Sequence, residues 1–396
     1  MVIHEHAYIF LKHNQDVTIF AGRGEESALP PGSKFRLIPE MDSQNERIEF
    51  LSKQLEQGEV PPNFEQMLRE IYNVLSPVIE EFDHVIVHNI FTKHFNLPLT
   101  AALFRMLDEQ IIKDCIAWCH DFTWTSPRSS SKVHPGYPWD LLRTYRSDLS
   151  FVTVSKQRQQ TLAGLLEIPE ELVHVVYNGV NPDQLLGLSS EASALIDRLE
   201  LLESDLIILM PVRVTRAKNI ELALQTAAML KDNDIRIKLV ITGPPDPHDS
   251  ESMAYFQSLR NLRQNLSIKN EVHFVFESGP EIDTPYFIDN QIVGDLFRVA
   301  DLMLMPSHQE GFGMPVLEAG LVGIPVVSTD VPAAEEIGKR DFLSFDSEDS
   351  PKEVAMLIMN WIEVSFRYRL RRRVRQQYTW ESIYRQRIQP LLNLRP

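Results

Sequence analysis

The stretch LMLMPSHQEGFGMPVLEAGLVGIPVVST, residues 302–329, joins two short apolar runs through a glycine-containing loop and a helical pattern. The runs at 302–306 and 325–328 show no polar alternation, which is typical of strands that are covered on both faces. Pro315 stands at the start of the helical pattern, where its fixed φ and its missing N–H cost little. The stretch therefore predicts a strand–helix–strand unit of a parallel sheet.

The same alternation of strand and helix continues along most of the chain, in two series. We expect strands at 16–21, 83–88, 114–119, 149–154 and 173–177, and then at 205–211, 235–242, 271–276, 302–306 and 325–328. Helical patterns include 2–12, 64–80, 156–166, 220–230 and 354–364, and the chain from 351 onward contains helices without strands. Because alternating strands and helices form parallel sheets through crossover connections, we predict an α/β protein of two doubly wound domains.

The boundary between the two series is expected between residues 181 and 203, where NPDQLLGLSSEAS is polar and rich in turn formers. We assign residues 1–185 to the first domain and 186–375 to the second. Residues 376–396 form a final helix.

Composition restricts the classes of protein that this chain can represent. The 396 residues carry 39 basic and 55 acidic side chains, a formal charge of −16, which argues against a nucleic-acid binder. No apolar run reaches the length of a membrane span, so we expect a cytoplasmic protein. Six arginines within 367–375 are a local exception. As a helix, this segment could make a weak peripheral contact with an anionic membrane or contact a nucleic acid, and a solvated face or a bridge between domains is the alternative.

The two cysteines, Cys115 and Cys119, are too few for a disulfide framework and lie on one expected strand. Side chains along a strand point alternately to opposite faces, so these cysteines and the neighbouring His120 and Asp121 do not converge as metal ligands. We expect both cysteines in the core and no metal site.

The loop before the helix at 314–322 has the features of an anion site. Gly311 and Gly313 allow close approach of a ligand to the backbone, and the helix N-terminus offers N–H groups to a diphosphate. Glu310 precedes the helix and Glu318 lies about one turn into it, so the two carboxylates could reach different hydroxyl groups of one extended ligand. Two ordinary exposed carboxylates are an equally good interpretation of this spacing alone.

A second group of candidate residues lies in VRVTRAKN, residues 212–219, which follows an expected strand. Ligands of doubly wound proteins bind at the carboxyl ends of the strands. Arg213 and Lys218 could there bind phosphate oxygens, the arginine in a bidentate manner and the lysine as a point charge. A solvated basic loop is the alternative.

Taken together and in order, these motifs resemble the retaining glycosyltransferases of family 4, which have the GT-B fold. The resemblance lies in the E-x7-E spacing of EGFGMPVLEA (310–319) and in FVTVSKQRQQTL (151–162), VVYNGVNPD (175–183), VRVTRAKN (212–219), ADLMLMPS (300–307) and YTWESIYRQRI (378–388). It implies two Rossmann-like domains that face a cleft, an N-terminal domain for the acceptor, a C-terminal domain for the donor, and a last helix that crosses back to the first domain.

The resemblance also implies an activity. Members of the family transfer a hexose from a nucleotide diphosphate sugar, such as a UDP- or GDP-sugar, to an acceptor hydroxyl with retention and without a metal or other cofactor. Arg213 and Lys218 match the cations that neutralise the departing diphosphate. Glu310 matches the carboxylate on the donor sugar, and Glu318 the one on the ribose. Phe312, Gly313, Met314 and Pro315 match the loop whose backbone covers the sugar and phosphates.

In the first domain, His120 and Asp121 of AWCHDFTW end an expected strand. By position they resemble the family's histidine that faces the cleft, and so imply contact with the sugar or the acceptor. A lone histidine at a strand end is more often structural, and without the resemblance that interpretation would be favoured.

Two departures from the family pattern are visible. Family members begin with a strand and a glycine-rich loop, whereas HEHAYIFLKHNQDVTIFAG (4–22) matches the helix that follows that loop. Residues 330–334, DVPAA, stand where a glycine pair is common. Two alternatives to a transferase stay open. One is a GT-B sugar-nucleotide epimerase, against which the family-4 signature argues, and the other is a non-catalytic homologue that binds a nucleotide sugar, which the first departure supports.

Overall fold

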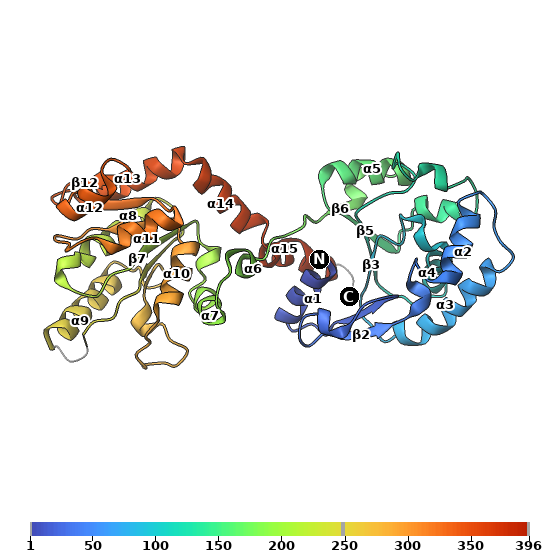
Figure 1. The fold of residues 1–396 in the computed structure, drawn as a ribbon, viewed down its shortest axis with the longest axis horizontal. Coiled ribbons are helices and arrows are strands. Elements are labelled where there is room, and N and C mark those ends of the chain that lie inside the picture. Colours follow the sequence, from blue (N-terminus) through green and yellow to red (C-terminus); the bar gives the residue numbers. More distant parts are fainter. Residues whose placement is uncertain (1, 247–249, 394–396) are drawn as a thin grey trace. The chain divides into compact units, whose positions relative to one another are not determined.

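The computed structural model describes residues 2–246 and 250–393, which fold as two units (Figure 1). Unit 1 comprises Met1–Gly179 together with Trp380–Pro396, and unit 2 comprises Val180–Thr379. The end of the chain therefore returns to the first unit, as expected for a final helix that crosses back. Residues 394–396 of the predicted last helix lie outside the described residues, as do residues 247–249.

Unit 1 is built around two parallel sheets. Its strands are β1 Thr18–Ala21, β2 Lys34–Leu37, β3 Val85–His88, β4 Cys115–Cys119, β5 Leu149–Thr153 and β6 Val173–Val175, in the orders β1-β2 and β3-β4-β5-β6. Its helices are α1 Val2–Lys12, α2 Glu46–Leu55, α3 Phe64–Ile79, α4 Leu97–Asp108, α5 Lys156–Leu166, α15 Trp380–Ile383 and α16 Gln389–Leu392, with a π-helical turn at Tyr384–Ile388.

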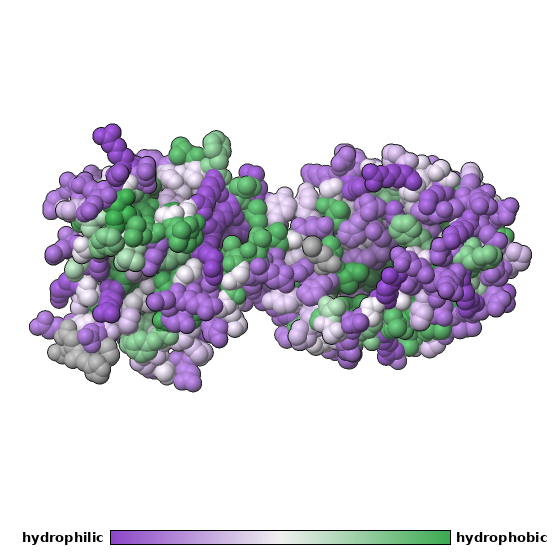
Figure 2. Space-filling model, in the orientation of Figure 1, coloured by the Kyte–Doolittle hydropathy of each residue, from purple (hydrophilic) through white to green (hydrophobic). Residues whose placement is uncertain are grey.

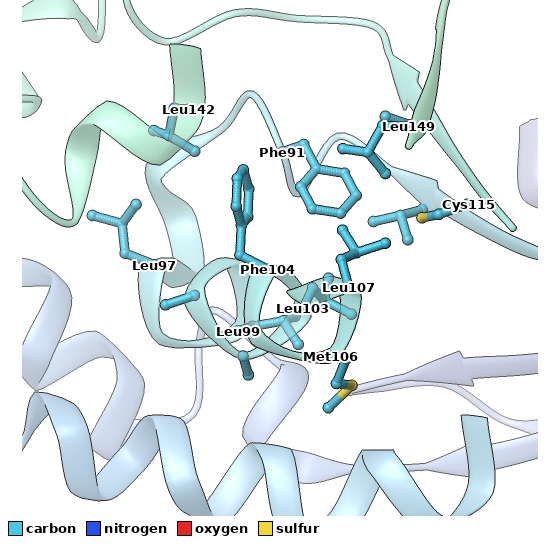
Figure 3. Packing of buried hydrophobic residues seen from close by; sticks show 14 of the residues in the cluster. Phe91, Leu97, Leu99, Leu103, Phe104, Met106, Leu107, Cys115, Leu142 and Leu149 are labelled. Atoms are coloured by element: carbon cyan, nitrogen blue, oxygen red, sulfur yellow. The ribbon is translucent and has the colours of Figure 1, made fainter. Parts of the chain in front are cut away.

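Both faces of the larger sheet of unit 1 are covered, because alternate side chains of each strand point to opposite faces. Cys115 and Cys119 of β4 belong to the core cluster that contains α3 and α4, which confirms that both cysteines are core residues. Figure 3 shows this cluster around α4, with Phe104 beside Phe91 and Leu107 on the side of Cys115. Ile116 and Trp118 point to the other face and pack with α1 and α15.

Unit 2 has one parallel sheet of six strands in the order β12-β11-β10-β7-β8-β9. The strands are β7 Leu206–Met210, β8 Ile237–Ile241, β9 Val272–Phe274, β10 Leu302–Met305, β11 Val326–Thr329 and β12 Leu343–Phe345. The helices are α6 Pro182–Leu186, α7 Ser190–Arg198, α8 Ile220–Asp232, α9 Ser250–Asn265, α10 Asn290–Val299, α11 Met314–Val322, α12 Pro332–Gly338, α13 Pro351–Val364 and α14 Phe366–Gln377. Core clusters on both faces of this sheet confirm the doubly wound class.

The strand order of unit 2 reverses between β7 and β10. From β7 the chain adds β8 and β9 on one side, and it then crosses to the other side to add β10, β11 and β12. Such a reversal leaves a crevice at the carboxyl ends of the two central strands, which is where doubly wound domains bind ligands.

Some helices and strands were not expected. The stretch at 181–193, expected to be rich in turns, carries α6 and the start of α7, and α7 buries Ala192, Leu195 and Ile196 in the core of unit 2. Strands β2 and β12 were also not expected.

The arginines of α14 contact carboxylates of unit 2 rather than forming only a solvated face. Nη2 of Arg372 lies 2.8 Å from Oδ1 of Asp205. Nη2 of the buried Arg375 lies 2.9 Å from Oδ2 of the buried Asp301. Both aspartates directly precede central strands of the sheet, so these ion pairs attach α14 to the amino ends of the strands. Among residues 2–246 and 250–393, no helix combines the length and the apolar character that a membrane crossing requires.

Candidate active site

The loops that follow β7 and β10 meet at the reversal point of the unit 2 sheet. The two strands are neighbours, with Leu302 opposite Ile208 and Met303 opposite Leu209. Beyond their ends, the N–H of His308 donates to the carbonyl of Ala217 at 2.9 Å. This hydrogen bond ties the two loops together and brings the predicted basic loop against the predicted carboxylate loop.

An ion pair also links these two loops. The ammonium of Lys218 donates to Oε1 of Glu310 at 2.7 Å, and the Glu310 side chain is only 7% exposed. The hydroxyl of Ser307 donates to the same oxygen at 2.5 Å. The carbonyl of Ser307 in turn accepts from the hydroxyl of Thr329 at 2.6 Å. The carboxylate is therefore held by a cation and by the hydroxyl of a buried serine whose carbonyl is fixed to β11.

The structure thus brings together two of the predicted residues, and it adds Ser307 and Thr329, which sequence reasoning missed. Both lie at the carboxyl ends of adjacent strands, β10 and β11. Because ligands of doubly wound domains bind at the carboxyl ends of the strands, this position in the sequence could have identified both residues as candidates.

Arg213 lies in the loop directly after β7, and its side chain is exposed. The backbone beside it is packed tightly against Gly243, whose N–H donates to the carbonyl of Val212 at 3.0 Å. A Cβ on Gly243 would lie 2.7 Å from the Cα and N atoms of Arg213. The other cation of this loop, Arg216, stacks on the ring of Tyr255 with 4.8 Å between the guanidinium carbon and the ring centroid.

Helix α11 begins at the end of the glycine loop, as the sequence predicts. Gly313 caps the helix with φ of 84°, a left-handed conformation that glycine adopts without strain. Pro315 occupies the first turn, and Phe312 and Met314 are 58% and 54% exposed. Figure 2 shows an apolar patch over α11. This arrangement leaves the loop accessible to a ligand.

Glu318 lies on α11 and is exposed. The structure does not bring it into the ion pair of Lys218 and Glu310, which agrees with the expectation that the two carboxylates contact different parts of one ligand but does not test it.

His120 and Asp121 lie in unit 1, directly after β4. The side-chain oxygen of Asn89, which follows β3, accepts from the N–H groups of His120 at 2.7 Å and of Asp121 at 3.2 Å. Oδ1 of the Asp121 carboxylate lies 3.3 Å from Nη2 of Arg158, at the start of α5. Asn89 was not predicted, and it fixes the backbone of both predicted residues.

Two further histidines adjoin His120. The imidazole of His88 lies 3.4 Å from that of His120 between ring nitrogens, and the rings of His88 and His6 are 5.3 Å apart. Burial, together with the neighbouring His120, lowers the pKa of His88 to about 3. Burial also lowers the pKa of His120, against the opposing effect of Asp121. The cluster is therefore neutral at neutral pH, and a neutral imidazole can accept or donate a hydrogen bond.

The match to a known family lies in unit 2. Residues 193–378 match the family described as "Glycosyl transferases group 1". The chain is 29% identical over 204 residues to an uncharacterized glycosyltransferase of Methanocaldococcus jannaschii, covering 51% of this chain and 47% of that protein. It is 24% identical over 278 residues to the mannosylglucosylglycerate synthase of Petrotoga mobilis, covering 67% and 63%.

A third relative is the D-inositol 3-phosphate glycosyltransferase of Streptomyces scabiei, 31% identical over 182 residues, covering 45% of this chain and 38% of that protein. The chain thus spans less than two thirds of the length of each of these relatives. Among solved structures, a glycosyltransferase from Rickettsia africae aligns with 99% of this chain and 94% of its own at 15% identity and a TM-score of 0.36. Residues 193–378, which include Lys218 and Glu310, are therefore similar to the group 1 glycosyl transferases.

Proposed function

We propose that this protein is a retaining hexosyltransferase that transfers a sugar from a nucleotide diphosphate sugar to an acceptor hydroxyl, without a metal. The observation that carries the proposal is the meeting of Lys218 and Glu310 at the reversal point of the unit 2 sheet, beside the N-terminus of α11. The cation and the helix N-terminus match the negatively charged diphosphate of such a donor, and the carboxylate matches its sugar hydroxyls.

The diphosphate is assigned to Lys218 and Arg213. An ammonium has three N–H donors, so Lys218 can keep its hydrogen bond to Glu310 and still donate to phosphate oxygens. Arg213 is exposed at the same loop and offers a planar fork to a second phosphate oxygen. As the sugar–phosphate bond breaks, negative charge grows on the diphosphate, and cations held in advance stabilise it in the transition state.

The donor sugar and the nucleoside are assigned to the two glutamates. Glu310 is oriented by Ser307, and a carboxylate held in this way can accept hydrogen bonds from sugar hydroxyls. Glu318, exposed on α11, is proposed to bind the ribose hydroxyls. The loop Phe312–Pro315 covers the sugar and the phosphates through its backbone.

The acceptor is assigned to unit 1. His120 is proposed to contact the sugar or the acceptor hydroxyl near the reacting carbon, and Asp121 to bind the acceptor. In the proposed front-face reaction the acceptor oxygen forms a bond to the anomeric carbon on the side from which the diphosphate leaves. The leaving phosphate oxygen takes the hydroxyl proton, so the configuration is retained without a protein nucleophile.

The decisive experiment is calorimetric titration with UDP-, GDP- and ADP-sugars. One donor should bind the intact protein, and Lys218→Ala should weaken that binding by about tenfold or more, because a hydrogen bond to a charged group contributes about 1.5–3 kcal/mol. Lys231→Ala is the matched control, because Lys231 lies at the other end of α8 and pairs with Glu271. Binding of none of the three sugars would contradict the proposal.

Product analysis then separates transfer from the alternatives. The anomeric configuration of the product, read by NMR, should equal that of the donor. A new sugar nucleotide formed without any acceptor would instead indicate an epimerase. Donor binding without turnover in the presence of a broad acceptor panel would indicate a binding protein.

A further inference from the structure

Helix α14 carries two groups of arginines. The first group contacts carboxylates of unit 2 and comprises Arg371, Arg372 and Arg375. The second group is exposed, and in the part of the chain that the structure describes none of its members pairs with a carboxylate; it comprises Arg367, Arg369 and Arg373. The first group attaches the helix to unit 2, and the second is available to a partner outside this unit.

Exposed apolar side chains accompany the second group of arginines. Phe366 and Leu370 are 81% and 60% exposed, and because they are four residues apart they share one face of α14. Val364, the last residue of α13, is 70% exposed. Figure 2 shows apolar surface where α13 meets α14. Neighbouring exposed apolar side chains of this size indicate an interaction site.

The apolar and the basic side chains belong to one surface. Arg369 lies three residues after Phe366, and its guanidinium carbon lies 4.9 Å from the centroid of the Phe366 ring. Arg367 and Arg373 lie three residues before and after Leu370, so both are its neighbours on the helix surface. We call this surface the outer face of α14; it consists of Val364, Phe366, Arg367, Arg369, Leu370 and Arg373.

The end of α11 adjoins the outer face. A Cβ on Gly323 would lie 3.4 Å from Nη1 of Arg367, so the two segments are in contact there. Leu321, two residues before this glycine, is 91% exposed. A further exposed apolar side chain therefore stands close to the arginines of the outer face.

The local charge is opposite in sign to the charge of the whole chain. The formal net charge is −16, but residues 364–377 contain six arginines and no acidic residue. Glu363, directly before this stretch, is exposed. Charges more than about 8 Å apart in solvent are largely screened at physiological ionic strength. The distant carboxylates therefore do little to prevent an anionic partner from binding at the outer face.

We propose that the outer face of α14 binds the surface of a membrane that contains anionic lipids. A helix that lies in a membrane surface combines apolar side chains, which enter the boundary between headgroups and acyl chains, with arginines or lysines beside them. Phe366 and Leu370 supply the apolar contact. The three outward arginines bind the anionic headgroups.

Two other partners fit the outer face less well. A twofold interface with a second copy of this chain would place the arginines of one copy against those of the other. A nucleic acid would bind the arginines through its phosphates, but it would offer no apolar layer to the aliphatic Val364 and Leu370. An anionic membrane provides both the charge and the apolar layer.

The test is cosedimentation of the 396-residue protein with phosphatidylcholine vesicles that contain phosphatidylglycerol, compared with vesicles of phosphatidylcholine alone. The protein should bind the anionic vesicles and not the neutral ones. Raising the salt concentration from about 0.05 M to about 0.5 M should weaken this binding by about tenfold or more, because salt screens the arginines.

Two sets of substitutions separate the charge from the apolar contact. Arg367→Gln, Arg369→Gln and Arg373→Gln together should weaken vesicle binding by about 100-fold, because each cation near an anionic surface contributes about fivefold. Phe366→Ser together with Leu370→Ser should weaken it by about tenfold. All five side chains are exposed, so the thermal midpoint of the protein should stay the same.

Each set has a matched control in unit 2. Lys269→Gln, Lys339→Gln and Arg340→Gln together change the formal charge by the same amount at other exposed positions. Leu185→Ser together with Ile282→Ser removes two apolar side chains that are 73% and 92% exposed. Neither control should change vesicle binding.

Absence of binding to the anionic vesicles at low salt would overturn the proposal. An equal loss of binding in the basic control would also overturn it, because binding would then depend on total charge and not on the outer face. A dimer in solution that Phe366→Ser with Leu370→Ser dissociates would assign the face to a second copy. Tighter binding to a DNA duplex than to the vesicles, lost in the arginine variant, would assign it to a nucleic acid, and either result would contradict the proposal.

Discussion

The ammonium of Lys218 and the carboxylate of Glu310, 92 residues apart in the chain, form a hydrogen bond of 2.7 Å at the point where the strand order of unit 2 reverses. The residue proposed to bind phosphate is thus held by the residue proposed to bind sugar. The pair keeps the lysine side chain in place before a ligand arrives, and it couples the two halves of the donor site.

Replacing Glu310 with glutamine should separate its electrostatic effect on Lys218 from its proposed contact with the donor sugar. Glu310→Gln removes the charge that competes for Lys218, so the affinity for the nucleoside diphosphate alone should be equal or higher. Turnover of the sugar donor should fall by about 10²-fold or more, as expected for loss of a positioned polar group in a transition state. Calorimetry with the diphosphate and initial-rate kinetics with the full donor measure the two effects.

The control for this change is Glu335→Gln, an exposed glutamate of α12 in the same unit. It should leave both quantities unchanged. A parallel loss of diphosphate affinity in Glu310→Gln would show that the carboxylate supports phosphate binding and not only the sugar.

The ion pair between Arg375 and Asp301 should contribute strongly to the stability of unit 2. Their side chains are 5% and 1% exposed and lie 2.9 Å apart, and Asp301 also accepts from the N–H of Ile207 at 2.9 Å. Arg375→Leu leaves the buried carboxylate with only the more distant Arg371, whose Nε lies 3.7 Å from Oδ1 of Asp301, and this should lower the free energy of unfolding by about 3–5 kcal/mol. Urea denaturation measures this loss.

Arg373 on the same helix is exposed, and Arg373→Leu should change the free energy of unfolding by no more than about 0.5 kcal/mol. Similar effects of the two substitutions would show that α14 acts through its general charge and not through the buried pair.

The course of the strands could be predicted because each central strand is an uninterrupted apolar run, such as Leu206–Met210. β2 (Lys34–Leu37) escaped prediction because its sequence KFRL is half basic and mostly exposed. β12 has only three residues and carries no periodic signal. α6 and α7 were not predicted, although both begin with residue types that commonly cap helices. The side-chain oxygen of Asn181 accepts from the N–H of Asp183, and the hydroxyl of Ser189 accepts from the N–H of Ala192.

The charged residues of the site could be predicted from the sequence, but the residues that hold them in place could not. Motif resemblance pointed to Lys218 and Glu310, and the strand-end rule explains why two distant loops meet. Ser307 carries no motif of its own, because its role comes from burial and from its neighbour Thr329. His6 and His88 belong to different elements, and only tertiary packing brings them to His120.

Buried histidines of unit 1 should make stability depend on pH. The pKa of His88 is about 3 in the folded protein against an ordinary value of 6.5, and burial lowers the pKa values of His6 and His120 as well. Between these values the unfolded chain binds a proton at His88 and the folded chain does not. The free energy of unfolding should therefore fall as the pH decreases from about 6.5, by up to about 1.4 kcal/mol per pH unit for this group.

Urea denaturation at about pH 7 and about pH 5 measures this loss, which should be smaller in His88→Gln. Substitution of the exposed His308 in unit 2 serves as the control for removing a histidine. An unchanged pH dependence in His88→Gln would show that His88 is protonated in the folded state.

Gly243 should be required for the shape of the Arg213 loop. A Cβ there would lie 2.4 Å from the carbonyl oxygen of Val212 and 2.7 Å from the backbone of Arg213, which cannot move aside as a flexible side chain can. Gly243→Ala should therefore displace the loop, weaken donor binding by about tenfold, and destabilise unit 2 by about 1–3 kcal/mol.

Gly294 in α10 is the matched control, because a Cβ there meets nothing within 4 Å. Gly294→Ala should stabilise the protein by about 0.5–1 kcal/mol through helix propensity and leave donor binding intact. Normal donor affinity in Gly243→Ala, measured by the same calorimetric titration, would show that the position of Arg213 does not matter for the diphosphate.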